Sequence, residues 1–242
     1  MWLMPALMAI SLALCTMAVA ADYATTFATP EDPLSEGMIW QHATNIWKHV
    51  RIVGDGSTAN PHRAVGHDNR VYDDAYAQLA GFAPDQLAEA TIWIDPTIPA
   101  HEIHEVELHL RWADSTDRAG TQESARGYEL LLAYDGAYYA IVRWNGPYGR
   151  FARLAVGYHL SPVPKTGDAI RGTAVGTTIR FYIDRHDGAG FVLLCAAIDT
   201  GSGGGPWRDG DPGIGFCQIG DNLQGPGGDR FGFTGFVASQ TG

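Results

Sequence analysis

Short segments in which apolar and polar residues alternate fill the chain from about residue 86 to its end, separated by glycine, proline, aspartate and asparagine. Alternation with a period of two places successive side chains on opposite faces of a strand. No long segment has helical periodicity. The predicted strands are 88–95, 105–112, 128–134, 138–145, 151–156, 169–175, 178–184, 191–198, 214–219 and 230–238. Closely spaced strands without helices between them predict an all-β sandwich or jelly roll rather than a parallel α/β sheet.

One turn and one loop complete this prediction. Asp135-Gly136 lies between two aromatic-rich strands and can supply the positive φ values of a two-residue hairpin turn. Earlier in the chain, residues 23–27 and 46–53 are predicted strands. The polar stretch 54–75 is predicted to be a long loop, which in a compact domain is usually functional or mobile.

The size and charge of the chain limit its organisation and partners. It has 242 residues, 45% of them hydrophobic, and no low-complexity linker or internal repeat divides it, so we expect one domain over residues 21–242. The 27 acidic and 16 basic residues give a formal net charge of −11, which argues against a nucleic-acid or anionic-membrane surface. All but two of the basic residues are arginines, whose rigid guanidinium groups suit oriented contacts.

Residues 1–20 have the features of an export signal. Residues 5–20 are almost entirely apolar and end in Ala18-Val19-Ala20, an A-x-A cleavage pattern. The segment is shorter than the roughly 20 apolar residues of a membrane span, although its first four residues lack the usual positive charge. The predicted location of the mature protein is therefore secreted or periplasmic, without a membrane span.

Removal of this signal leaves two cysteines, Cys195 and Cys217, both in apolar strand-like segments. In an oxidising compartment they could form a disulfide. The alternative is a pair of buried thiols, and the sequence leaves both open. The two residues lack the C-x-x-C spacing of a metal site.

Segments in the last third of the chain carry a family resemblance. They are Gly176–Asp184, Ala197–Asp199, the Gly-rich loop leading to Asp211-Pro-Gly-Ile-Gly-Phe216, and Phe231–Phe236. Their order resembles the closing half of concanavalin A-like lectin and glucanase sandwiches. The resemblance implies a two-sheet antiparallel jelly roll, with one sheet often concave, and frequently a carbohydrate ligand. It does not imply catalysis.

The predicted strand 105–112 concentrates titratable side chains. Regular alternation places Glu105, Glu107, His109 and Arg111 on one face, and Trp112 with the neighbouring leucines on the core face. This polar row could belong to a binding site. The alternative is a solvated sheet face with cross-strand ion pairs, since antiparallel sheets commonly leave one face in water.

A second predicted strand gives another set of polar side chains, in which alternation groups Tyr139, Arg143 and Asn145 on one face. These side chains suit sugar hydroxyl groups or a uronate carboxylate, which arginine can hold by two parallel hydrogen bonds. If the two strands share a sheet, Arg111 and Arg143 could converge on one anion. The alternative is that Arg143 pairs with an acidic residue of the neighbouring strand, such as Glu129.

One enzymatic interpretation is a retaining glycosidase. Glu102-Ile-His104-Glu-Val-Glu107 resembles the E-I-D-x-x-E signature of laminarinase and lichenase glycosidases, which implies Glu102 as nucleophile and Glu107 as acid. His104 replaces the assisting aspartate of that signature. Regular alternation also sends Glu102 and Glu107 to opposite faces, so a retaining pair would need a bulge.

The other enzymatic interpretation is a lyase that cleaves a polyuronate. This reaction needs a base to remove a proton next to the carboxylate and groups that stabilise the resulting anion. His109 or Tyr139 could be the base. The stabilising groups would be Arg111, Arg143 and Asn145.

Trp93 and Trp207 are further ligand candidates, because indole faces stack on sugar rings. Trp93 alternates with polar residues and Trp207 lies in a loop; packing in the core is the alternative for tryptophan in a sandwich. No cofactor is predicted apart from a structural Ca²⁺, for which oxygen-rich turns offer Asp55, Asp68, Asp199 and Asp229.

Taken together, these patterns predict a secreted single-domain β-sandwich that binds a polysaccharide or oligosaccharide. Polysaccharide cleavage, by a lyase or a retaining glycosidase, is the second hypothesis. A structural or adhesive envelope protein is the third.

Overall fold

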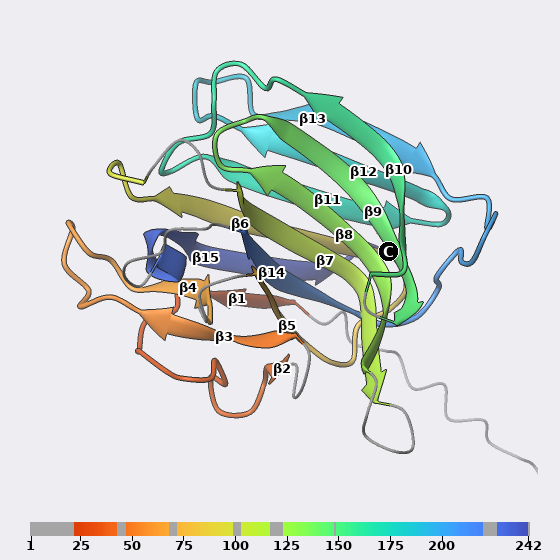
Figure 1. Ribbon diagram of the computed structural model, residues 1–242, viewed down its shortest axis with the longest axis horizontal. Coiled ribbons are helices and arrows are strands. Elements are labelled where there is room, and N and C mark those ends of the chain that lie inside the picture. Colours follow the sequence, from red (N-terminus) through yellow and green to blue (C-terminus); the bar gives the residue numbers. More distant parts are fainter. Residues whose placement is uncertain are drawn as a thin grey trace, which may run out of the picture.

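A computed structural model describes residues 22–42, 47–67, 72–98, 103–116, 123–147, 149–219 and 227–241. In these residues the chain forms β-strands and one short 3-10 helix, η1 (Gly227–Arg230), and no α-helix. The strands lie in two layers that face each other (Figure 1). The all-β architecture predicted from the alternating segments is confirmed.

One layer, the first sheet, has the strand order β10-β9-β8-β7-β14-β5. Each neighbouring pair in it is antiparallel. The strands are β10 (Phe151–Tyr158), β9 (Tyr138–Pro147), β8 (Glu123–Ala133), β7 (Ile103–Thr116), β14 (Asp211–Ile219) and β5 (Tyr72–Gln78), with the short β2 (Gln41–His42) beside β5.

The other layer, the second sheet, has the order β3-β4-β15-β6-β11-β12-β13 and is also antiparallel. Lys48 and His49 of β3 run parallel to β5, so β3 joins the two sheets at one edge. The strands are β3 (Lys48–Val53), β4 (Arg63–Gly66), β15 (Phe231–Gln240), β6 (Gln86–Ile94), β11 (Ala169–Val175), β12 (Thr178–Asp184) and β13 (Phe191–Ile198), with β1 (Tyr23–Thr25) beside β15.

Apolar side chains that alternate with outward-facing ones fill the space between the sheets. On β6, Ala88, Ala90 and Ile92 are buried, whereas the residues between them are partly exposed. Leu108 and Leu110 of β7 join the same core from the first sheet. Burial of each such leucine contributes about 1.5–3 kcal/mol to the free energy of folding. The same alternation decides which side chains of the first sheet face away from the core.

The prediction of one long loop over residues 54–75 is wrong in part, because β4 and the beginning of β5 lie within it. The polar residue of β4 is Arg63, whose guanidinium donates a 2.7 Å hydrogen bond to the backbone oxygen of Asp229 and lies 3.8 Å above the ring of Trp93. A charged side chain is thus satisfied within a buried strand, which alternation does not reveal. The predicted hairpin between β8 and β9 is confirmed, but the connection spans residues 134–137 instead of two residues, and of Asp135 and Gly136 only Gly136 has a positive φ, of 71°.

The predicted export signal, residues 1–20, lies outside the described residues and stays a prediction. So does the single-domain assignment of residues 21–242. In the part of the chain that the structure describes, no helix is long and apolar enough to cross a membrane.

Strand β7 contains one extra residue relative to β8. The register is regular up to Leu110 and resumes at Ala113, and Arg111 has a φ of 52°. Opposite this bulge, Gly127 has a φ of 141°, and a β-carbon there would lie 2.7 Å from the backbone oxygen of Arg111. A bulge reverses the alternation that follows it, so Arg111 turns away from the outer face of the first sheet and Trp112 turns onto it.

We expect Gly127→Ala to destabilise the protein by about 2–4 kcal/mol, because the new β-carbon meets backbone atoms at a strained φ. Urea unfolding measures this loss. The matched control is Gly235→Ala on β15, where the nearest atom to a new β-carbon is 3.5 Å away, and its effect should stay below about 1 kcal/mol. Equal losses in the two variants would contradict the bulge.

Candidate functional site

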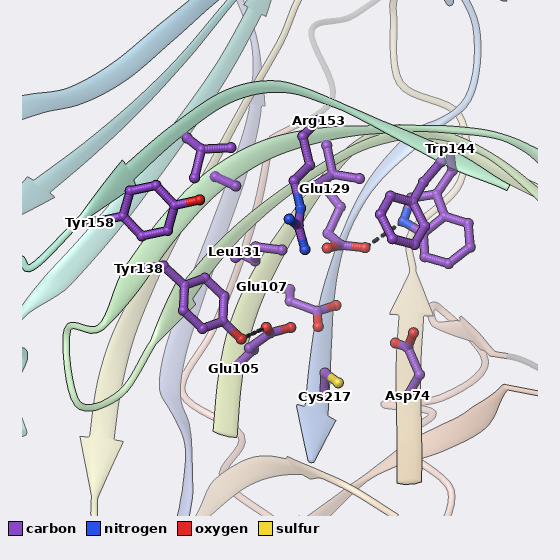
Figure 2. A pocket seen from close by; sticks show the side chains of 14 residues that line it. Asp74, Glu105, Glu107, Glu129, Leu131, Tyr138, Trp144, Arg153, Tyr158 and Cys217 are labelled. Atoms are coloured by element: carbon purple, nitrogen blue, oxygen red, sulfur yellow. Dashed lines mark hydrogen bonds between the residues drawn. The ribbon is translucent and has the colours of Figure 1, made fainter. Parts of the chain in front are cut away.

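The outer face of the first sheet is hollowed into a cavity of about 290 Å³ (Figure 2). Its lining comes from all six principal strands of the sheet, because every second residue of each strand points away from the core. Aromatic rings form part of the wall and carboxylates gather on the floor. The lining residues are Asp74, Glu105, Glu107, Glu129, Leu131, Tyr138, Ala140, Val142, Trp144, Phe151, Arg153, Val156, Tyr158 and Cys217.

Two of the floor carboxylates are held by hydrogen bonds from the aromatic wall. The indole nitrogen of Trp144 donates to Oε2 of Glu129 at 2.5 Å, and the hydroxyl group of Tyr138 donates to Glu105 (Figure 2). Glu107 is only 1% exposed. Among the described residues that line the cavity, Arg153 on β10 is the one basic side chain, and it is exposed.

The floor carboxylates strongly disfavour one another's ionisation. Burial raises the pKa of Glu107 well above its usual range, and the charges of Glu129, Asp74 and Glu105 raise it further. Burial likewise raises the pKa of Glu129, and Asp74 and Glu105 add to the effect. These carboxyl groups therefore hold protons at a pH at which an exposed glutamate has lost its own.

His109 lies beside this floor as a neutral imidazole. Its ring stacks on Trp112, with centroids 3.9 Å apart, and its Nε2 lies 3.2 Å from Oε2 of Glu107. Burial lowers the pKa of His109 to about 3. Gly215 of the neighbouring strand β14 makes room for both groups, since a β-carbon there would lie 2.2 Å from Glu107 Oε2 and 2.7 Å from His109 Nε2.

The predicted grouping of Glu107 with His109 is confirmed, but Arg111 does not share their face. The bulge sends its guanidinium toward the end of the sandwich, where it donates to the backbone oxygens of Pro84, Gly176 and Trp207 at 2.5, 2.8 and 2.8 Å. The prediction that Arg111 contacts a ligand beside His109 is therefore wrong. The extra residue in β7 interrupts the regular alternation of side chains between the two faces.

Tyr139, Arg143 and Asn145 do share a face, as predicted, but it is the face toward the interior. Arg143 is 2% exposed and forms a 2.5 Å ion pair with Asp199, and Asn145 Oδ1 accepts a 2.9 Å hydrogen bond from it. Tyr139 packs against the core.

The predicted ion pair of Arg143 with Glu129 is therefore wrong, and the Arg143 guanidinium is engaged by Asp199 instead of sharing an anion with Arg111. Glu129 lies on the opposite face, in the cavity, and Arg111 does not converge with Arg143 on an anion. The candidate base His109 lies on the cavity side of the sheet, whereas Tyr139, Arg143 and Asn145 face the interior, so the residues chosen for a polyuronate lyase are divided between two faces.

The two tryptophans chosen as ligand candidates lie outside the cavity lining. Trp93 is on the outward-facing side of β6, beneath Arg63. The indole nitrogen of Trp207 donates to the backbone oxygen of Trp144 at 2.8 Å, and the guanidinium of Arg126 lies 5.3 Å from its ring.

Cys195 and Cys217 are free thiols, so the disulfide alternative is not realised. Cys195 lies on β13 in the second sheet, whereas Cys217 lies on β14 and faces the cavity on the far side of the first sheet. Burial and the neighbouring carboxylates raise the pKa of Cys217, so it stays protonated.

The residues suggested for calcium are partly engaged elsewhere. Asp199 is bound by Arg143, and Asp229 by Arg51 at 2.7 Å. Asp55 accepts a hydrogen bond from the backbone of Ser57. Asp68 and the suggested nucleophile Glu102 lie outside the described residues.

Sequence patterns alone missed Asp74, Trp144 and Arg153 as cavity residues. Asp74 lay in the stretch predicted as a loop. The available signal for Trp144 was the alternation of 138–145, which places it on the face opposite Arg143.

Comparison with protein-family models finds no match, and neither does a search of curated proteins. Among solved structures, the metal-free form of the VIP36 exoplasmic/lumenal domain aligns with a TM-score of 0.55 and 10% identity, covering 91% of this chain and 92% of that one. The Ca²⁺/Man3GlcNAc-bound form of that domain aligns with a TM-score of 0.54 and 11% identity over 84% of each chain. The carbohydrate-binding module CBM66 from Bacillus subtilis has a TM-score of 0.46 and 13% identity, over 86% of this chain and 96% of that one.

The fold is a concanavalin A-like jelly roll. The alignments to the VIP36 domain confirm the two-sheet arrangement that the sequence resemblance predicted. At 10–11% identity they show the fold alone.

The raised pKa values predict how stability depends on pH in metal-free protein. An unfolded glutamate has a pKa of about 4.3. Above that pH the folded state, in which these pKa values are raised, binds more protons than the unfolded state. The free energy of unfolding therefore falls as the pH rises through the folded-state pKa. Glu129→Gln should make this fall shallower, and urea unfolding from about pH 4 to about pH 8 in a chelator measures it. Glu89→Gln, in a half-exposed ion pair on the second sheet, is the control and should leave the slope nearly unchanged.

Proposed function

We propose that this protein binds carbohydrate in the cavity of the first sheet. The observation that carries the proposal is the combination of exposed aromatic rings and buried carboxylates in one hollow of a jelly-roll sheet. Aromatic faces stack on the C–H faces of sugar rings, and carboxyl oxygens accept hydrogen bonds from sugar hydroxyl groups. A volume of about 290 Å³ is near the lower end for ligand pockets and suits one sugar unit better than a long chain.

The side chains divide these tasks. Tyr158 is 64% exposed and Phe151 is 45% exposed, both on the edge strand β10, so they offer stacking surfaces at the rim. Glu105, held by Tyr138, offers an oxygen acceptor at the floor. Arg153 supplies the donor that a purely acidic site would lack.

Similar structures support the proposal. The VIP36 domain, which shares the fold, is described in a Ca²⁺/Man3GlcNAc-bound form. A glycan ligand and a structural Ca²⁺ are proposals for this chain on the same basis, and export to the cell exterior or periplasm is a proposal on the basis of residues 1–20.

The test is substitution at the rim. Once a glycan array has identified a ligand, we expect Tyr158→Ala to weaken its binding roughly three- to tenfold in calorimetry, because a stacking face is lost. Tyr182→Ala is the matched control: this tyrosine is half-exposed on β12 in the second sheet and should not affect binding. Absence of any retained glycan, or equal losses in both variants, would overturn the proposal.

Glycoside hydrolysis is the second candidate, favoured by one observation. Carboxyl oxygens of Glu107 and Glu129 lie within 4.8 Å of each other on the cavity floor, close to the roughly 5–5.5 Å separation of a retaining pair. The coupled pair would share a proton. The protonated member would donate it to the glycosidic oxygen while the ionised member attacks the anomeric carbon, and water would then release the sugar.

Reducing-end release from a panel of neutral polysaccharides, in a chelator, tests hydrolysis. Glu107→Gln and Glu129→Gln should each reduce the rate at least about 100-fold, while Tyr182→Ala retains it. A protein that binds a glycan but releases no reducing ends would refute hydrolysis and leave the binding proposal standing.

A further inference from the structure

We propose that Glu107, His109 and Glu129 form a binding site for one divalent transition-metal ion of the class of Zn²⁺ or Mn²⁺. Each residue offers one ligand atom, and the three atoms lie within 4.8 Å of one another. All three side chains are buried. The site would lie at the floor of the cavity and does not depend on whether the cavity binds sugar.

Three strands fix the positions of these ligands. The register places His109 directly opposite Glu129 across β7 and β8, and Glu107 lies two residues before His109 on the same face. Gly215 of β14 leaves space beside both side chains of β7. The ligands therefore project from the middle of a sheet rather than from loops, which favours a preformed site.

Part of the required geometry already exists. His109 Nε2 and Glu107 Oε2 are 3.2 Å apart, and ligand atoms around a tetrahedral zinc ion with bonds of about 2.1 Å are separated by about 3.4 Å. The other separations between ligand atoms are at most 4.8 Å. Adjustments of the side chains alone would shorten them to the distance that the ion requires.

The charge of the two carboxylates is a second reason to expect a cation at this site. Within the described residues, no arginine or lysine forms an ion pair with Glu107 or Glu129, although both are buried beside Asp74 and Glu105. Arg153 on β10 acts on Glu129 from beyond ion-pair distance and offsets only part of one charge, and two ionised carboxylates are costly in a buried site. A divalent cation would offset both charges, where otherwise protons must be bound.

The burial and fixed orientation of the His109 ring independently favour its role as a metal ligand. Its ring is 1% exposed and fixed by stacking on Trp112, and its Nε2 lies on the side of Glu107 Oε2, 3.2 Å away. A neutral imidazole has one nitrogen lone pair to give to a metal.

The donor set selects the kind of ion. One imidazole nitrogen and two carboxylate oxygens match zinc and manganese, and a fourth coordination position would open to the cavity. Ca²⁺ is disfavoured, because it takes six to eight oxygen ligands.

Calorimetric titration of the full chain with Zn²⁺, after removal of metals by a chelator, tests the proposal. We expect one ion per chain, and we expect Glu107→Gln and the near-isosteric Glu129→Gln each to weaken binding at least about tenfold. Ca²⁺ should compete poorly. Circular dichroism confirms that each variant folds.

Two controls exclude other metal sites. His49→Gln alters a histidine cluster near Asp32, where His49 and His67 ring centroids lie 4.6 Å apart, and should leave zinc binding unchanged. Binding of Co²⁺ to the wild-type protein should give no thiolate charge-transfer band, whereas a band lost in Cys217→Ser would assign the ion to Cys217 with Glu105 and Glu107. That band, absence of stoichiometric binding, or undiminished binding in Glu129→Gln would overturn the proposal.

Discussion

The bulge in β7 is the constraint on which both the loops and the cavity depend. At a φ of 52°, Arg111 leaves the face of the sheet and donates to three backbone oxygens from three separate segments, those of Pro84, Gly176 and Trp207. The same extra residue brings Trp112 onto the outer face, where it stacks on His109. One local insertion thus ties the loops together at one end of the sandwich and fixes the imidazole beside the carboxylates.

Charge is distributed unevenly between the interior and the cavity. Three arginines are each at most 5% exposed, namely Arg63, Arg111 and Arg143. Their guanidinium groups donate hydrogen bonds to backbone oxygens, to Asp199 or to other internal groups. The rigid fork of arginine suits this role better than the flexible ammonium group of lysine. The cavity instead collects acidic side chains, namely Asp74, Glu105, Glu107 and Glu129. The arginines that suggested an anionic sugar, Arg111 and Arg143, are therefore absent from the cavity lining, where Arg153 is the basic side chain among the described residues.

The sequence predicted the fold better than the site, because the two depend on different information. Period-two alternation is local and located the strands from residue 88 onward, together with the turn at Gly136. Which face is interior depends on pairing between distant strands: Arg143 faces inward because Asp199, 56 residues later, is there to receive it. The reversal at Arg111 and the strand character of Asp74 likewise follow from cross-strand contacts that no local pattern records.

The charge state of the floor connects the proposed activities. Glu107 and Glu129 are too close and too deeply buried to be ionised together without help. Shared protons would leave one acid and one base, which suits hydrolysis. A bound cation would keep both carboxylates ionised and would expose a coordination position toward the cavity, which suits binding of hydroxyl groups. Proton and metal compete for the same oxygens, so the metal content of the protein would determine whether this floor is arranged for hydrolysis or for binding.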